Sequence, residues 1–236
     1  MDKGVKVDKE VVLFDIHLWL QEQLVISGAK GFVVGMSGGI DSSVVAALCK
    51  KTESNTLGIF MPCGFTPEDA FEDAKEVANK FNIEFLFRSL DKSYREMILS
   101  LGVLEENPDE DGMHVANIKP RLRMITLYYF ANKNNFLVAG TGNKTEEVLG
   151  YFTKYGDGGV DILPIGDFLK TEVKELARFL DIPERIITKP PTAGLWEGQT
   201  DEKEIGMSYE NIDKILTKME NSEHKRNTPP TFMHFE

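Results

Sequence analysis

The stretch VVGMSGGIDSSVVAAL, residues 33–48, contains the features that decide the fold. A short apolar run rich in β-branched residues ends in a Ser-Gly-Gly turn, and a helical pattern begins immediately after it. Glycines allow the backbone to approach a phosphate closely, and the free N–H groups at the start of a helix point toward such an anion. The hydroxyl groups of Ser37, Ser42 and Ser43 can add donors. The turn is therefore a candidate phosphate site. It is not the common G-x-x-x-x-G-K-[ST] loop, because no lysine follows the glycines.

Asp41 within this turn raises a question of charge. A carboxylate beside a phosphate is repulsive unless a cation lies between them, so Asp41 implies magnesium if the turn binds phosphate. The alternative is a tight strand-to-helix turn capped by Ser37, in which Asp41 only stabilises the helix N-terminus. The turn by itself leaves both interpretations open.

The rest of the chain alternates strand and helix patterns, which is typical of an α/β domain with a mainly parallel sheet flanked by helices. Short apolar runs predict strands at residues 31–36, 55–62, 83–90 and 135–140. Helical periodicity and helix-start signals predict helices at residues 9–27, 40–51, 66–81, 91–101, 115–133, 144–150, 170–180 and 209–219. In such sheets ligands bind beyond the carboxyl ends of the strands, where the glycine turn is expected. We expect a single domain over residues 1–236.

Three segments lack this periodicity. The polar residues near 102–114 are interpreted as a link inserted within the domain, and residues 182–196 are expected to be extended and loop-like. The segment LWEGQTDEKEIG, residues 195–206, carries many charges and no apolar period. We expect it to be a mobile loop that closes over the site when substrates bind.

Composition limits the function classes. The 236 residues are 42% hydrophobic and 28% charged, and no apolar run approaches the roughly 20 residues of a membrane span. The polar N-terminus does not resemble a secretory signal, so the cytoplasm is the expected location. The two cysteines form no C-x-x-C pair, which argues against a disulfide framework or a zinc site. A net charge of −11 argues against nonspecific binding to nucleic acid or anionic membranes. A polyphosphate substrate would therefore require a local concentration of cations.

The motifs resemble a known family. GMSGGIDSS, residues 35–43, resembles the pyrophosphate loop of the ATP pyrophosphatase superfamily, whose architecture is Rossmann-like. Further motifs resemble ammonia-dependent NAD synthetases, occur in that family's order and extend the similarity over most of residues 10–230. These motifs are NIKPRLRM (117–124), GTGNKTEEVLGYFTKYGDGGVDILPIGDFLKTEV (140–173), KPPTAGLWEGQTDE (189–202) and SEHKR (222–226). The resemblance implies that the nicotinate carboxylate of deamido-NAD is adenylated by ATP, with release of pyrophosphate, and then amidated by ammonia to give NAD and AMP.

The resemblance also implies roles for individual residues. Magnesium would be held by Asp41 and Glu146. ATP would be bound by Gly35, Met36, Ser37, Gly38, Gly39, Ile40, Asp41, Ser42, Thr141, Lys170 and Thr192. Deamido-NAD would be bound by Arg121, Lys154, Asp161, His224 and Lys225. The same family pairs its subunits through the helix at residues 115–133, which implies a homodimer. One departure is Pro120, which stands where alanine is familiar in the family.

Two acidic residues carry alternative interpretations. Asp157, between the glycines of KYGDGG, is a candidate to bind ammonium and assist its deprotonation, but it could equally form an ordinary Asp-Gly turn. We count it with Asp41, Glu146 and Lys170 as a candidate catalytic residue. Glu146 could simply favour a helix N-terminus, a role that Glu147 would fill as well.

Two other functions compete with this interpretation. One is another pyrophosphate-loop amidating ligase, such as a GMP-synthetase-like enzyme, against which the long glycine-rich run argues. The other is a non-catalytic module that binds adenine nucleotides. A module of this kind would need neither a second magnesium carboxylate nor a late pair of cations.

Overall fold

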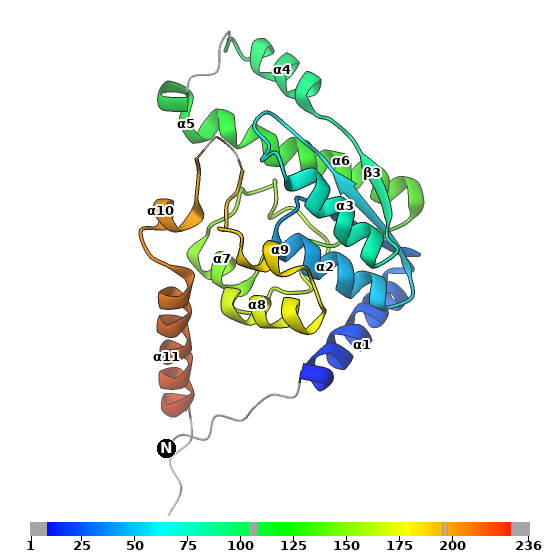
Figure 1. Ribbon diagram of the computed structural model, residues 1–236, viewed down its shortest axis with the longest axis vertical. Coiled ribbons are helices and arrows are strands. Elements are labelled where there is room, and N and C mark those ends of the chain that lie inside the picture. Colours follow the sequence, from blue (N-terminus) through cyan, green and yellow to red (C-terminus); the bar gives the residue numbers. More distant parts are fainter. Residues whose placement is uncertain (1–8, 104–107, 195, 197, 228–236) are drawn as a thin grey trace, which may run out of the picture.

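A parallel four-stranded sheet lies at the centre of the molecule, with the strand order β3-β2-β1-β4 (Figure 1). The computed structural model describes residues 9–103, 108–194, 196 and 198–227; for residues 108–111 and 222–227 it describes the backbone only. The strands are β1 (Gly31–Gly35), β2 (Asn55–Phe60), β3 (Glu84–Phe87) and β4 (Leu137–Val138). β1 is paired in parallel with both β2 and β4, so the first and fourth strands are neighbours.

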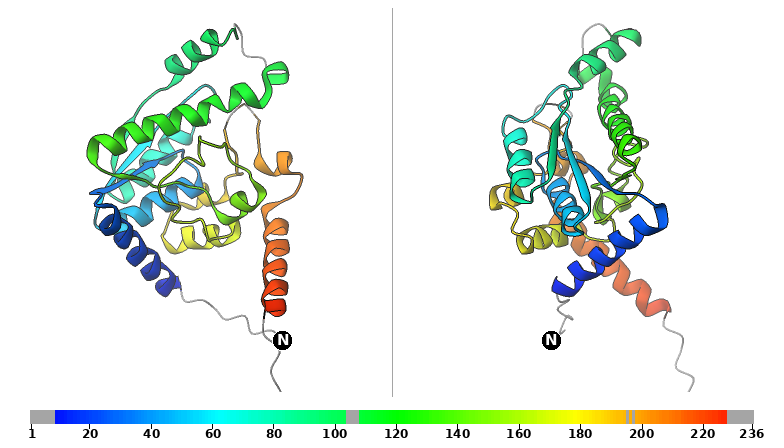
Figure 2. Two further views of the ribbon diagram at one scale, coloured as in Figure 1. Left: turned by 180° about the vertical axis from the view of Figure 1, so that it is seen from behind. Right: turned by 90° about the vertical axis from the view of Figure 1, so that its right-hand side faces the viewer.

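The strand β1 is buried on both faces, which explains its uninterrupted apolar sequence GFVVG. Successive side chains point to opposite faces, so Val33 belongs to one core and Val34 to the other. The first core contains residues of α2 (Ile40–Lys51), α3 (Ala70–Lys80) and α8 (Lys170–Phe179). The second contains residues of α4 (Asp91–Ser100) and α6 (Ile118–Asn134). The side view in Figure 2 shows the sheet between these two helical layers.

Most of the predicted helices are present, and the predicted fold class is confirmed as a single α/β domain with a parallel sheet. The first helix, α1 (Lys9–Ser27), and α2 have the predicted bounds. Pro120 lies in the first turn of α6, where its missing N–H costs nothing. The remaining predicted helices are α7 (Lys144–Leu149), α8 and α11 (Tyr209–Asn227), the last longer than expected. Among the described residues, no helix is both long and apolar enough to cross a membrane.

The segments predicted to be irregular contain three short helices. They are α5 (Pro108–Ala116), α9 (Glu184–Thr188) and α10 (Asp201–Ile205). The polar link predicted near residues 102–114 thus includes much of α5, which Gly112 interrupts with a positive φ of 51°. In α9, Ile186 and Ile187 are buried in the first core, and this tertiary packing favours a helix in a region that Pro190 and Pro191 made look extended.

Candidate active site

The turn between β1 and α2 has the geometry of an anion site. Gly38 has a φ of +83°, and a Cβ atom there would lie 2.3 Å from the carbonyl oxygen of Ala70, so only glycine fits. Gly39 occupies the N-cap of α2 and offers no side-chain acceptor to the first-turn N–H groups. The hydroxyls of Ser42 and Ser43 donate to the carbonyl of Gly39, at 3.0 and 2.8 Å, and hold the turn in shape. Ser37 accepts from the Gly39 N–H at 3.2 Å, so it braces the turn without being the helix cap.

This turn opens into a cavity of about 440 Å³ at the carboxyl ends of the strands. The cavity is lined by all the residues predicted to bind ATP, namely Gly35, Met36, Ser37, Gly38, Gly39, Ile40, Asp41, Ser42, Thr141, Lys170 and Thr192. Glu146 and Asp157 line the same cavity. Residues from β1, the loop after β4, α7, α8 and the loop after α9 thus meet in one place, as the predicted parallel topology requires.

Lys170 joins the two carboxylates that were predicted to hold magnesium. Its ammonium nitrogen lies 2.6 Å from Oδ2 of Asp41 and 3.0 Å from Oε1 of Glu146. The Lys170 side chain is only 3% exposed. Asn143, the N-cap of α7, donates to Asp41 at 3.2 Å and accepts from the N–H of Glu146 at 3.1 Å. Asp41 and Glu146 therefore share one cation position, which the Lys170 ammonium occupies.

The electrostatics of this cluster follow from its burial. Burial, with the negative charge of Asp41, raises the pKa of the Glu146 carboxyl to about 7 against the opposing effect of Lys170. Burial lowers the pKa of Lys170, but the charges of Asp41 and Glu146 outweigh this, and its pKa lies above its ordinary value. Lys170 therefore remains an ammonium ion at neutral pH. No group of three or more His, Cys, Asp or Glu side chains suited to a metal occurs in the described part of the chain. A divalent ion at Asp41 and Glu146 would thus need further oxygen ligands from a phosphate or water.

A second polar group lines the cavity around Asp157. The Thr153 N–H donates to its carboxylate at 3.0 Å. Asp157 is exposed overall, yet desolvation by the cavity wall raises the pKa of its carboxyl above the ordinary value. Arg123 lines the same cavity and donates from Nε to the Met61 carbonyl at 3.1 Å. Arg123 was not predicted as a site residue, although it lies in the NIKPRLRM motif only two residues from Arg121.

Three of the residues predicted to bind deamido-NAD lie outside the lining of this cavity. Arg121, Lys154 and Asp161 do not line the cavity, and all three are exposed. Arg121 donates to the Lys154 carbonyl at 3.3 Å, so those two are neighbours. Asp161 accepts from the Tyr128 hydroxyl at 3.0 Å and from the Val138 N–H at 2.8 Å. The side chains of His224 and Lys225 lie outside the described residues.

The segment predicted to be a mobile loop is tied to the body of the protein through α10. Asp201 is buried, and it accepts from the hydroxyls of Tyr151 and Tyr209, each at 3.2 Å. Tyr151 also donates to Glu204. The ring centre of Tyr209 lies 5.1 Å from the Lys170 ammonium. The hydrogen bond between Asp201 and Tyr209 therefore connects the segment to the cluster of Asp41, Glu146 and Lys170. Tyr151 lies within the motif of residues 140–173 but was not predicted as a site residue, and Tyr209 lies in none of the motifs.

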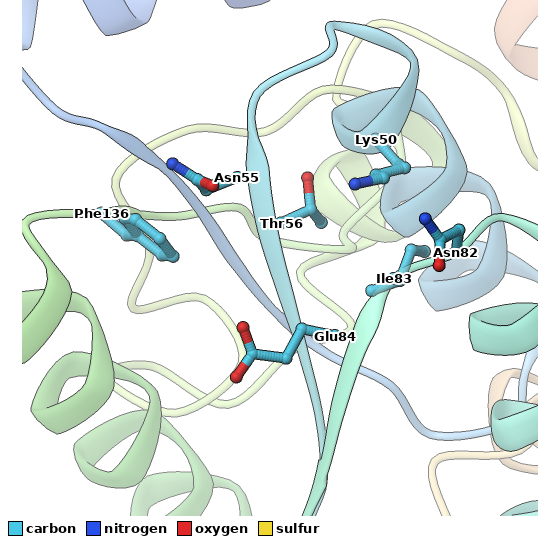
Figure 3. A pocket seen from close by; sticks show the side chains of 7 residues that line it. All are labelled: Lys50, Asn55, Thr56, Asn82, Ile83, Glu84 and Phe136. Carbon is cyan, nitrogen blue, oxygen red and sulfur yellow. The ribbon is translucent and has the colours of Figure 1, made fainter.

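A second hollow, of about 310 Å³, lies at the amino ends of β2 and β3 (Figure 3). Of the described residues, those that line it are Lys50, Asn55, Thr56, Asn82, Ile83, Glu84 and Phe136. None of the predicted site residues is among them. The cavity at the carboxyl ends of the strands is therefore the candidate active site.

Comparison with known proteins decides the family. The sequence family described as NAD synthase matches residues 12–231. The chain belongs to the NAD synthase family. A relative in the NAD synthase family, the NH3-dependent NAD+ synthetase of Carboxydothermus hydrogenoformans, is 54% identical over 205 residues, which cover 86% of this chain and 84% of that protein.

Two solved structures resemble this chain closely. The NMN synthetase of Francisella tularensis superposes with a TM-score of 0.85 at 38% identity and covers 90% of this chain and 87% of its own. The NH3-dependent NAD synthetase of Campylobacter jejuni superposes with a TM-score of 0.77 at 31% identity and covers 95% and 90%. The family and enzyme class predicted from the motifs are thus confirmed. The roles of individual residues stay predictions.

Proposed function

We propose that this chain amidates deamido-NAD with ammonia, converting ATP to AMP and pyrophosphate. The observation that carries the proposal is the meeting of Asp41, Glu146 and Lys170 beside the glycine turn in one cavity, within a chain of the NAD synthase family. Such a site suits a reaction in which a carboxylate must approach a polyphosphate, because positioning and charge neutralisation are what that reaction needs.

The reaction has two steps. An oxygen of the nicotinate carboxylate attacks the α-phosphorus of ATP, and the bond from that phosphorus to the bridging oxygen breaks to release pyrophosphate. Ammonia then attacks the carbonyl carbon of the acyl-adenylate, the bond to the adenylate oxygen breaks, and AMP leaves as ammonia's surplus proton is lost. The N–H groups in the first turn of α2 bind the phosphates. The Lys170 ammonium turns from the carboxylates toward the phosphates.

Magnesium fits the residues present. Asp41 and Glu146 each place one oxygen against the Lys170 ammonium, and carboxylate oxygens are ligands that magnesium prefers. Magnesium would bind these two oxygens once that ammonium turns toward the phosphates. When bound, the ion would neutralise the negative charge on the pyrophosphate. Asn143 fixes both carboxylates from outside this pair.

We propose that deamido-NAD extends beyond the cavity. Arg121 and Lys154 contact its outer part, together with Asp161, His224 and Lys225. A homodimer formed through α6 accounts for the exposure of Ile125 and Tyr129, which are 58% and 61% exposed. We place the enzyme in the cytoplasm.

The nitrogen source and the acceptor can be tested in one assay. With ATP, magnesium, deamido-NAD and ammonium, we expect NAD, AMP and pyrophosphate in equal amounts. Glutamine freed of ammonium should give no NAD, because the Carboxydothermus hydrogenoformans relative, 54% identical to this chain, is an NH3-dependent enzyme. Equal rates with glutamine would refute the ammonia dependence.

A mononucleotide acceptor is the second candidate, because the NMN synthetase of Francisella tularensis is more similar in structure and sequence than the Campylobacter jejuni enzyme. Nicotinate mononucleotide is therefore run beside deamido-NAD in the same assay. We expect a higher kcat/KM with deamido-NAD. A higher kcat/KM with nicotinate mononucleotide would mean that the mononucleotide is the acceptor.

Asp157 is proposed to bind ammonium and assist its deprotonation. Asp157→Asn should slow amidation by about 10²-fold, the lower range for a general base, and leave adenylate formation nearly unchanged. The two steps are separated by comparing NAD formation with pyrophosphate–ATP exchange. Asp167→Asn, which changes an exposed acid outside the cavity, is the control. An unaltered dependence on ammonium would show that Asp157 only shapes its turn.

The segment at residues 195–206 is proposed to close over the acyl-adenylate and exclude water. Limited proteolysis should cut this segment more slowly with ATP and deamido-NAD present than with either absent. Cleavage at the same rate under all conditions would mean that the segment is an ordinary surface loop.

A further inference from the structure

The N-cap residue of the helix that carries Lys170 supplies no acceptor to the first turn, although Glu172 accepts from the N–H of that residue. Leu169 occupies the N-cap of α8, and its hydrocarbon side chain cannot accept a hydrogen bond. The N–H groups of Lys170 and Thr171 in the first helical turn therefore need acceptors from elsewhere, because an α-helix leaves its first N–H groups without intrahelical partners. Both acceptors come from other helices.

Thr145 of α7 and Asp213 of α11 supply these acceptors. The Lys170 N–H donates to the Thr145 hydroxyl at 3.0 Å, and this hydroxyl donates in turn to Oδ1 of Asp213 at 2.6 Å. The other oxygen of Asp213 accepts from the Thr171 N–H at 2.8 Å. Thr145 is fully buried and Asp213 is 3% exposed, so water does not substitute easily for either bond. The carboxylate also lies at the positive end of the α8 dipole.

These bonds fix the two helices that carry reactive groups relative to each other. Glu146 follows Thr145 directly in α7, and Lys170 begins α8. Asp213 therefore holds the backbone of Lys170 next to the backbone of Glu146. One turn earlier on α11, the Tyr209 ring lies against the Lys170 ammonium. The backbone of Lys170 is thus held by Thr145, which Asp213 of α11 fixes in turn, and its charged end lies against Tyr209 of α11.

We propose that Asp213, acting through Thr145, is a positioning residue that sets where the Lys170 ammonium and the Glu146 carboxylate lie relative to the bound ATP. The inference rests on the proposed function of the site. Asp213 is not among the residues that line the cavity, and its two oxygens accept from Thr145 and Thr171. The competing explanation is that the buried network contributes only to folding stability.

A pair of substitutions at Thr145 separates positioning from stability. Thr145→Val keeps the shape but removes both hydrogen bonds of the hydroxyl, whereas Thr145→Ser keeps the hydroxyl. Asp213→Asn keeps one acceptor oxygen where two are needed. Loss of a residue that orients a metal ligand typically reduces affinity or activity by about 10- to 100-fold. We expect Thr145→Val and Asp213→Asn to weaken the binding of magnesium and α,β-methylene-ATP by that factor, measured by calorimetry. Thr145→Ser should bind magnesium and α,β-methylene-ATP with an affinity within about threefold of the wild type.

A destabilised control completes the test. Val77→Ala removes two methyl groups from a fully buried position in α3, outside the cluster, and should lower Tm without changing the calorimetric affinity. If Thr145→Val and Asp213→Asn lower only Tm, as Val77→Ala does, the positioning role is wrong. Wild-type protein that binds the analogue but makes no NAD or NMN would refute the proposed function instead, and leave the binding comparison valid.

Discussion

Asp41→Asn is expected to slow pyrophosphate release by about 10³-fold, and Glu146→Gln by a similar factor. Both carboxylates lie within 3.0 Å of the same ammonium nitrogen, so both contribute to one cation position. A cation that neutralises a leaving pyrophosphate stabilises the transition state by several kcal/mol, and each 1.36 kcal/mol corresponds to about a tenfold change in rate. Rates are measured at saturating ATP with coupled pyrophosphate detection.

The double variant distinguishes one shared site from two independent effects. If both residues hold one ion, Asp41→Asn combined with Glu146→Gln should be little slower than either single variant, because contacting groups are not additive. Glu147→Gln, at the neighbouring position of α7, should retain nearly full activity. If Asp41 only favours its helix N-terminus, Asp41→Asn would cost about 1 kcal/mol of stability and keep normal turnover. Normal turnover by Asp41→Asn would contradict the assignment of Asp41 as a magnesium ligand.

Lys170→Met should produce the second large effect, and it should act on stability as well as on activity. The variant leaves two carboxylates, 19% and 16% exposed, beside each other without their shared counter-ion. Removing one member of a buried ion cluster typically costs about 3–5 kcal/mol of unfolding free energy. Turnover should fall by about 10²- to 10³-fold, because a fixed charge on the phosphates is lost.

Magnesium provides a specific check on the Lys170 variant. A divalent ion can replace the missing ammonium between Asp41 and Glu146, so magnesium should raise the Tm of Lys170→Met more than that of the wild type. Lys174→Met is the matched control on α8, since Lys174 pairs with the half-exposed Glu210 and should contribute at most about 1 kcal/mol. An equal magnesium effect on all three proteins would mean that the ion does not bind at these carboxylates.

The architecture could be predicted because local patterns determine it. The apolar stretch of β1, the glycine turn and the helix after it were visible in consecutive residues, and all three are present. The resemblance implied that Asp41 and Glu146 meet, and they do so because the neighbouring strands β1 and β4 lead into α2 and α7 at the same edge of the sheet. The helices α9 and α10 were missed because they are stabilised by tertiary packing, through Ile186 and the buried Asp201, while their local sequences favour turns.

The site was predictable where a motif carried it and unpredictable where support comes from distant helices. Every residue of the predicted ATP set lines the cavity. By contrast, nothing near Asp213 or Tyr209 in sequence indicates that they face Lys170, because only the packing of α11 against α8 brings them there. Arg123 shows a related difficulty, since helical phase within α6 decides that it lines the cavity while Arg121 is exposed.

The most direct test of the account follows the oxygen atoms of the nicotinate carboxylate. Deamido-NAD labelled with ¹⁸O in that carboxylate is turned over with ATP, magnesium and ammonium, and the products are analysed by mass spectrometry. Because a carboxylate oxygen attacks the α-phosphorus and leaves with the adenylate, AMP should carry one ¹⁸O atom and the NAD amide should retain the other. Unlabelled AMP, or ADP and phosphate in place of AMP and pyrophosphate, would contradict adenylation of the carboxylate at this site.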